Sequence, residues 1–599
     1  MFNSALQIGR SALNASSLGI QVAGNNMANA ATPGYSRQSA TLTPSRDARF
    51  GNGFVGRGVE MQAIRRQVDS ALQNRLLGSI AAEQQSQVDL SLLSNVEGTL
   101  NELSEQDLST QLGAFFSSWS DLASQPGNRG ARSLVIQQGR GLSTYIRSLR
   151  EGLADQQAAV DRDLTANTNR ANELLSRIAD LNAAVVTAEN GSGNANGLRD
   201  QRDTLIAELA QFMDVTTLEQ PNGNLDVLVG STPIVQAGVS RGVRLKTENI
   251  PASAGQPASL RVVVSTSDNN ETLAVRSGRL GALLNQRDSL ISQTIDRLDT
   301  LAAQLIHQVN RIHATGEPGQ PTSSFTGSFI TRTADVTRAI NDPDNLSFLE
   351  LRVRPTSGSF MVNIRNNATG ELQSARIEVD LDGLVNLTTP GFSADTSVDS
   401  LRSDLNALAN VSAAVTSDGR LNITADTGYS ISFSDDTSGV LATLGINSYF
   451  DGVDASNIDV RPDLQANPSA LVTGRRVPTG ATDPWARGAA EGDIVDNGTS
   501  LAIAALADRG LSELGGLSLG EHWEETANSI GVRTTSARTS ANAATVVRES
   551  LDAQRSAVSG VSIDEESISL LNFQRQYQAS ARLISVVDEL TQNLLTLVG

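Results

Sequence analysis

The two ends of this 599-residue chain carry apolar patterns of helical period, and these patterns constrain the fold more than any other feature. Residues 4–30 predict one helix, in which large apolar residues recur every seven positions: Leu6, Leu13, Ile20 and Met27. Small residues fill the intermediate positions at Gly9, Ser16 and Ala23. The steps therefore alternate between three and four, as in the seam of a coiled coil.

The C-terminal segment 563–598 predicts a second long helix, because Ser562 and Glu565 have capping-box spacing at its start. At 1.5 Å per residue it would be about 54 Å long. Its seam contains Leu570, Phe573, Tyr577, Ile584, Val587 and Leu594, and with Ser580 and Thr591 in the intermediate positions it steps by three and four throughout. Two such helices at opposite ends of a chain cannot bury their seams in a domain of their own. We expect them to pair with each other, with other copies, or with both, and to form an assembly module from residues 1–36 and 560–599.

Residues 37–66 predict an extended hinge with short strands, because glycines alternate there with β-branched residues. Thr32-Pro33-Gly34 should end the first helix. The string Gly51-Asn-Gly-Phe-Val-Gly56 matches a dinucleotide-binding fingerprint, but a strand pattern follows it where that fingerprint requires a helix. We interpret these positions as hinge residues: Pro33, Gly34, Gly51, Gly53 and Gly56.

The segments 67–316 and 498–559 together predict a bundle of long helices. Helices are expected over 67–123 and 131–189, antiparallel through a Pro-Gly turn, with a possible interruption of the second near Gly152. Alternating apolar residues predict a β region over 216–275 within this bundle, and helical periodicity returns over 278–313.

Residues 317–497 are rich in Ser, Thr, Asp and Asn with β-branched residues. We expect a β-rich domain from 317–345 with 451–497, and an outer, variable β-rich domain from 346–450. The fold class is therefore a multidomain α + β protein with paired terminal helices. The termini should lie together, with the β domains farthest from them.

Composition excludes several classes of function. The net charge of −19 disfavours nucleic acid and anionic membranes as partners. No apolar run approaches the roughly 20 residues that cross a bilayer, so membrane insertion is not expected. The absence of Cys removes thiolate chemistry.

The three histidines and the acidic strings give no convincing chemical site. His307 and His313 are six residues apart and face different sides of one helix, whereas His522 adjoins Glu521 without a nucleophile motif. Asp380-Leu-Asp-Gly383 lacks the third early acid and the distal Glu of an EF-hand and is interpreted as a turn. We therefore expect no catalytic residue, no cofactor and no metal.

Two terminal motifs resemble those of bacterial flagellar axial proteins. They are Asn25-Asn-Met-Ala-Asn-Ala-Ala-Thr-Pro-Gly-Tyr35 and Ser559-Gly-Val-Ser-Ile-Asp-Glu-Glu566, the latter followed by Leu571-Asn-Phe-Gln-Arg-Gln-Tyr-Gln-Ala579. Two segments in the middle of the chain narrow this resemblance to the hook-associated proteins, which lie where the hook and the filament meet. They are Leu198-Arg-Asp-Gln-Arg-Asp203 and the run from Gly278 to Gly316.

The resemblance implies a non-enzymatic structural adaptor that joins the distal end of the hook to the filament through a tube of terminal helices. Its implied partners are further copies of itself, the hook protein, a second hook–filament junction protein, an export chaperone and the type III export apparatus. It also implies a place in the extracellular flagellum, reached without a cleaved signal peptide. The first residues agree, because they contain no continuous apolar stretch of a secretory signal.

The sequence also leaves alternatives open: a hook-type or second junction protein, or a secreted adhesin carried on a helical stalk. A further hypothesis concerns residues of alternating charge such as Arg287 and Asp288, which either form intramolecular ion pairs or set the register between subunits.

Overall fold

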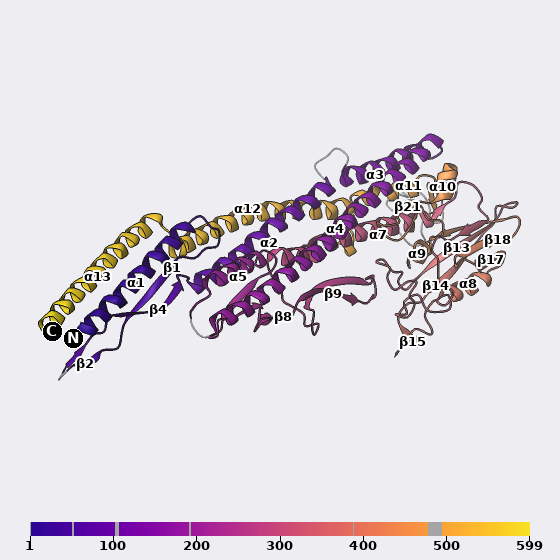
Figure 1. Cartoon of the computed structure of the whole chain (residues 1–599). Coiled ribbons are helices and arrows are strands. Elements are labelled where there is room, and N and C mark those ends of the chain that lie inside the picture. Colours follow the sequence, from indigo (N-terminus) through magenta and orange to yellow (C-terminus); the bar gives the residue numbers. More distant parts are fainter. Residues whose placement is uncertain are drawn as a thin grey trace.

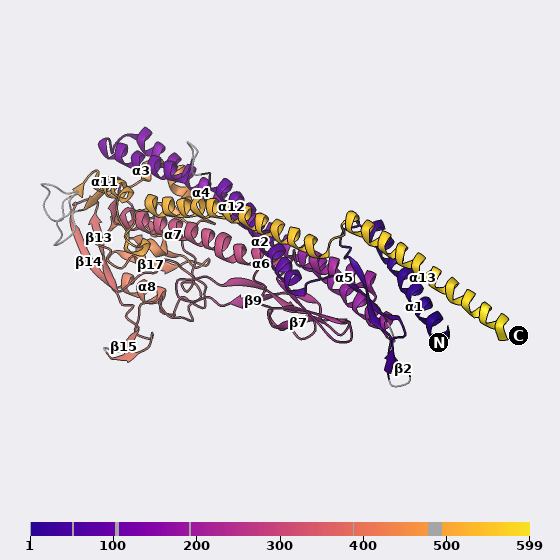
Figure 2. The same cartoon turned by 90° about the vertical axis from the view of Figure 1, so that its left-hand side faces the viewer.

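The protein is an elongated α + β molecule in the computed structural model, which describes residues 2–50, 53–101, 107–190, 193–386, 388–476 and 494–598. Figures 1 and 2 show both termini at one end of the molecule, long helices along its middle and small sheets at the opposite end. The predicted fold class is confirmed. Among the described residues, no helix is both long and apolar enough to cross a membrane.

The terminal end is built on α1 (Phe2–Ala28) and α13 (Ile563–Val598), which lie side by side (Figure 1). They are antiparallel, because Gly9 contacts Ile584 whereas Gly19 contacts Phe573. Strands β1 (Gln38–Pro44) and β4 (Val59–Arg66) form an antiparallel ribbon against α1.

The short strands predicted within 37–66 are present and form this ribbon, whereas a hinge role for the segment stays a prediction. Backbone pairing joins β1 to β4, and Val59 N of β4 donates to Ser11 Oγ of α1. A short hairpin, β2 (Ala48–Phe50) with β3 (Gly53–Val55), extends the ribbon.

Long helices form the middle of the molecule. They are α2 (Ser70–Leu100), α3 (Leu108–Ser124), α4 (Arg129–Glu189), α5 (Asn196–Leu209), α6 (Gly278–Gln286), α7 (Gln293–Ala314) and α12 (Leu519–Ser559), with a π-helical turn, Arg287–Ser292, joining α6 to α7. Shorter helical segments, α11 (Gly498–Ala504), Ala505–Ala507 and Ser512–Leu514, precede α12.

One prediction about these helices was wrong, and one alternative that the sequence left open is now decided. The expected helix over 67–123 is two helices, since Asn101 ends α2 with a left-handed backbone (φ 51°) and the Asp107 side chain caps α3 by accepting from Thr110 N. By contrast, α4 continues through Gly152 without interruption.

A small β region lies beside the bundle. Its strands are β5 (Val215–Glu219), β6 (Leu225–Val229), β7 (Thr232–Gln236) and β8 (Val239–Ser240) in one antiparallel sheet, and β9 (Val243–Ile250) with β10 (Ser259–Thr266) in a second. The bundle and this region share one hydrophobic core, in which Trp119 and Trp523 are fully buried.

Among the described residues, the distal end carries three three-stranded sheets, β14-β13-β19, β12-β18-β17 and β11-β22-β23. The elements of this end are β11 (Gly316–Glu317), β12 (Ser324–Thr326), β13 (Gly358–Asn366), β14 (Leu372–Val379), β15 (Leu384–Asn386), β16 (Thr389–Pro390), α8 (Val398–Asn406), β17 (Val411–Val415), β18 (Leu421–Ala425), β19 (Tyr429–Ser434), α9 (Val440–Leu444), β20 (Phe450–Asp451), β21 (Asp459–Val460), α10 (Pro462–Ala466), Pro468–Ala470, β22 (Gly474–Arg476) and β23 (Ile494–Val495).

The predicted division of the β-rich segment is corrected by how its side chains pack. Ile340 and Phe348 share one core with Phe360, so 317–345 and 346–450 are not separate domains. Within 451–476, Val460 and Leu471 instead belong to the core of the bundle. Packing rather than composition therefore sets the boundaries. Residues 477–493 of the predicted domain lie outside the described residues.

The charged residue Arg287 pairs within the chain. Its Nε lies 2.6 Å from Asp161 Oδ1 and its Nη1 lies 3.1 Å from Asp288 Oδ1, and its side chain is buried. The intramolecular alternative therefore holds for Arg287, whereas a role of these charges in the register between subunits stays a prediction.

Candidate functional site

The contact between α1 and α13 is made by small residues of α1. A Cβ at Gly19 would lie 2.5 Å from the Phe573 ring, and one at Gly9 would lie 2.8 Å from Ile584 Cγ1. Ser16 and Ala23 are buried at compatible helical spacing. Small residues therefore allow a close approach that larger side chains would prevent.

The large apolar residues predicted for the α1 seam lie beside this contact rather than at its centre. Leu6, Leu13, Ile20 and Met27 are all partly buried. On α13, the predicted residues divide between the two sides of the helix: Leu570, Phe573 and Ile584 are partly buried and Val587 is buried, whereas Tyr577 and Leu594 are exposed. The structure thus brings only some of the predicted seam residues together.

A second apolar face of α13 remains open to solvent. We call it the outer stripe; it consists of Leu583, Val586, Leu590 and Leu594, spaced by three, four and four residues. Their exposed fractions range from 42% for Leu583 to 52% for Val586. Four large apolar side chains on one exposed helix face are typical of an interaction surface.

The terminal motifs meet in a buried polar network at the inner end of the helix pair. Asn26 is 1% exposed. Its Nδ2 donates to Gln38 O (2.9 Å) and to Glu566 Oε2 (3.1 Å), and its Oδ1 accepts from Tyr35 Oη (2.8 Å) and Gln38 N (3.0 Å). All the hydrogen-bonding groups of one amide are therefore used to join α1, β1 and α13.

Glu566 is a buried carboxylate with a charged partner. Arg37 Nε lies 2.7 Å from Glu566 Oε1, and Arg37 N donates to Ser559 O at 2.9 Å. Tyr35 shares this environment: burial, and then the negative charges of Asp200 and Glu566, raise its pKa to about 12. The phenol therefore stays neutral and can donate to Asn26.

A second set of contacts ties this network to α5 of the bundle. Arg66 Nη1 lies 2.9 Å from Asp200 Oδ1 and 2.7 Å from Asp203 Oδ2, and Ser36 N donates to Asp200 Oδ2 at 3.3 Å. Gly34 has φ +79°, and a Cβ there would lie 2.4 Å from Thr204 Oγ1. Glycine is therefore required where the chain turns against α5.

The predicted hinge residues therefore lie in two separate places. Pro33 is exposed beside Gly34 at this joint, but Gly53 and Gly56 lie in and next to the β2–β3 hairpin, and Gly51 lies outside the described residues. Figure 1 places this hairpin beyond the N-terminal end of α1, far from the bundle, so its glycines do not lie between terminal and middle regions as predicted.

Sequence reasoning missed the residues of the polar network as site residues: Asn26, Tyr35, Arg37, Glu566, Arg66 and Asp200. The sequence did contain a signal for these residues. Most of them lie in or beside the motifs quoted above, and they are polar residues at the ends of apolar helical patterns. Their pairing could not be predicted, because Asn26 and Glu566 are 540 residues apart in the chain.

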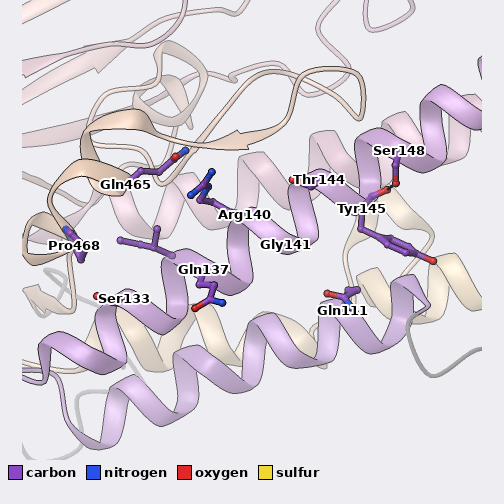
Figure 3. A pocket seen from close by; sticks show the side chains of 11 residues that line it. Gln111, Ser133, Gln137, Arg140, Gly141, Thr144, Tyr145, Ser148, Gln465 and Pro468 are labelled. Atoms are coloured by element: carbon purple, nitrogen blue, oxygen red, sulfur yellow. Dashed lines mark hydrogen bonds between the residues drawn. The ribbon is translucent and has the colours of Figure 1, made fainter.

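The cavity drawn in Figure 3 does not gather catalytic groups. It is a groove along α4 lined by 11 residues, and Arg140 is the single charged residue among them. Glu521 accepts from Ser518 N in a capping box, which gives it a structural role at the start of α12. No acid–base pair is evident at either place.

The two histidines of α7 serve packing. Burial lowers the pKa of His307 and of His313 to about 4. His313 Nδ1 lies 2.7 Å from Asn447 O, and Val472 N donates to His313 Nε2 at 3.2 Å. A neutral His313 therefore bridges α7 to two segments of the distal end.

Comparison with known proteins points to flagellar components. Residues 93–325 match the family described as flagellar hook-associated protein FlgK helical domain, and residues 553–597 match the flagellar basal body rod FlgEFG protein C-terminal family. The chain is 24% identical over 602 residues to flagellar hook-associated protein 1 of Escherichia coli, covering 98% of both chains. It is 26% identical over 357 residues to that of Bacillus subtilis, covering 54% of this chain and 70% of the relative.

A solved structure shares the fold. The flagellar hook junction protein FlgK from Burkholderia pseudomallei has a TM-score of 0.50 and 16% sequence identity, and the match covers 81% of this chain and 100% of that one.

Proposed function

Because the chain belongs to the flagellar hook-associated protein 1 family, we propose that its paired terminal helices are the surface through which it joins the hook to the filament. The protein is a structural component of the flagellum, outside the cell, and assembles with other axial proteins. The observation that carries the proposal is the outer stripe of α13, which α1 covers only in part: Leu583 approaches Gly9, whereas Val586 and Leu590 are about half exposed.

In the proposed assembly, the outer stripe of one copy packs against the row Leu6, Leu13, Ile20 and Met27 of the next copy. Both surfaces are apolar, both are at least partly open, and both run along the same helix pair. A contact between two different surfaces generates a ring or an open helical array rather than a closed pair. Burial of each large side chain would contribute roughly 1.5–3 kcal/mol.

The same geometry supports export before folding. The seam and the network join residues from opposite ends of the chain, so the helix pair forms only after both ends are available. We propose export by the type III apparatus without a cleaved signal peptide, with a chaperone covering the C-terminal helix. The hook protein and a second junction protein are the proposed neighbours at the two ends of the assembly.

We further propose that the protein is not an enzyme. Support comes from His313, which is buried and hydrogen-bonded within the fold, and from Glu521, which serves as a helix cap.

The test is complementation of a strain that lacks the gene. The deletion strain should complete its hooks but shed filament subunits into the medium, and the wild-type gene should restore filaments. The double variant Val586→Asn/Leu590→Asn should fail to restore them, although its monomer keeps the wild-type helical signal in circular dichroism.

The matched control is Leu218→Asn/Val239→Asn, which changes two apolar residues of the β region that are at least as exposed as Val586 and Leu590, and it should restore filaments. Normal filaments with the α13 double variant would refute the outer stripe as the interface. Normal filaments in the deletion strain would refute the junction role itself.

A further inference from the structure

Three aspartates meet at the base of the β15–β16 hairpin in the distal region. Asp380 directly follows β14, Asp382 lies two residues later, and Asp395 precedes α8. One carboxylate oxygen of each lies within 4.8 Å of the others. The sequence suggested only a turn here because a third acid was missing, but the fold supplies Asp395 from 13 residues beyond Asp382.

Asp395 is the unusual member of this cluster, because it is only 6% exposed. Its Oδ2 accepts from Gly383 N (2.9 Å) and from Asn341 Nδ2. Its Oδ1 is buried and has no hydrogen-bond partner among the described residues, and the same holds for Oδ1 of Asn341 beside it. A buried carboxylate oxygen without a partner is costly.

Within the described part of the chain, none of the three aspartates forms an ion pair with an arginine or lysine, although Arg side chains pair with acids throughout the molecule. Three carboxylates therefore converge, one of them buried, without a basic side chain to balance them. Such an arrangement is stabilised by a cation.

We propose that Asp380, Asp382 and Asp395 bind a Ca²⁺ ion, with Asn341 Oδ1 as a fourth protein ligand and water completing the shell. All donors are oxygens, which Ca²⁺ prefers at about 2.3–2.6 Å. Oxygens separated by up to 4.8 Å fit on a sphere of that radius. Mg²⁺ fits less well, because it is usually held by one or two carboxylates in strict octahedral geometry.

The ion would cross-link three segments of the distal region: the loop at Asn341, the end of β14 and the approach to α8. Backbone contacts already bring these segments together, since Thr396 N donates to Asp380 O and Ala339 bridges to Ser397. Bound Ca²⁺ therefore stiffens the base of the β15–β16 hairpin.

The test is calorimetric titration of the full-length monomer with CaCl₂ after dialysis against chelator. We expect one Ca²⁺ per chain with a Kd of roughly 10⁻⁴–10⁻³ M, the range of extracellular modules. Asp382→Asn and Asp380→Asn change exposed residues and should each weaken binding at least about tenfold, whereas MgCl₂ should bind more weakly than CaCl₂.

The control is Asp404→Asn, which removes one exposed carboxylate from α8 in the same region and should leave the Kd unchanged. Absence of saturable binding up to about 10 mM Ca²⁺, or equal Kd values for wild type and Asp382→Asn, would overturn the proposal. Circular dichroism of each variant checks the fold. The outcome does not depend on assembly, since the site is remote from α13 (Figure 1).

Discussion

The bundle and the terminal helix pair use apolar residues in opposite ways. In the bundle, large side chains such as Trp119 and Trp523 are fully enclosed by helices from the same chain. In the terminal pair, Gly19 and Ala23 are buried while Val586 and Leu590 stay about half exposed. The bundle therefore completes its own core, whereas the terminal pair keeps apolar surface for contacts that a single chain does not make.

The largest expected effect separates the two regions directly. Trp523→Ala should lower the free energy of unfolding by about 3–5 kcal/mol, because it leaves a cavity in the bundle core. Leu590→Ala, on the exposed side of α13, should change it by less than about 0.5 kcal/mol. Guanidinium unfolding of the monomers measures both values, and a large cost for Leu590→Ala would contradict the comparison.

The second prediction concerns the free energy of unfolding at acid pH. Burial lowers the pKa of His313 to about 4, so between pH 6.5 and 4 the unfolded chain binds a proton that the native chain does not. The contribution of His313 to the free energy of unfolding is fully present above pH 6.5. It falls by on the order of 3 kcal/mol as the pH approaches 4. Asp299, whose pKa burial raises to about 6, acts in the opposite direction.

The measurement is the free energy of unfolding as a function of pH, for the wild type and for His313→Gln. Asp299 contributes equally to the pH dependence of both proteins. The variant should show a weaker loss of stability between pH 6.5 and 4. Parallel curves for the two proteins would show that His313 is not neutral and buried in the native chain.

The third prediction sharpens the description of the terminal seam. Gly19→Val should weaken the pairing of α1 with α13 by about 1–3 kcal/mol, since its Cβ overlaps the Phe573 ring. Gly24→Ala is the control: no atom lies within 4 Å of the added Cβ, and Ala favours helix by up to about 1 kcal/mol. Hydrogen exchange of α1 amides should be faster in Gly19→Val and no faster in Gly24→Ala.

The smallest effects compare two neighbouring glutamates. Glu566→Gln should cost about 1–3 kcal/mol, because Glu566 is buried and accepts from Arg37 and Asn26. Glu565→Gln should cost less than about 1 kcal/mol, because its ion pair with Arg37 is exposed. Hydrogen exchange at the start of α13 measures both, and equal protection in the two variants would contradict the buried network.

The sequence alone determined most of the helical segments and what kind of molecule they build, although it did not show the break between α2 and α3. The seven-residue recurrence from Leu6 to Met27 and the three–four steps of α13 depend only on helical period, which is local. The motifs at both ends identified a flagellar axial protein, and the α + β class followed from composition and periodicity.

Only the tertiary structure decided which side of each helix is used. Periodicity could not distinguish the inner face of α13 from the outer stripe, because both are apolar, nor could it place Gly53 away from the joint. Contacts such as Asn26 with Glu566, or Asp395 with Asp380, join residues that local patterns treat separately. The physical reason is that burial and hydrogen bonding depend on which surfaces approach each other, and that is a property of the whole packed chain.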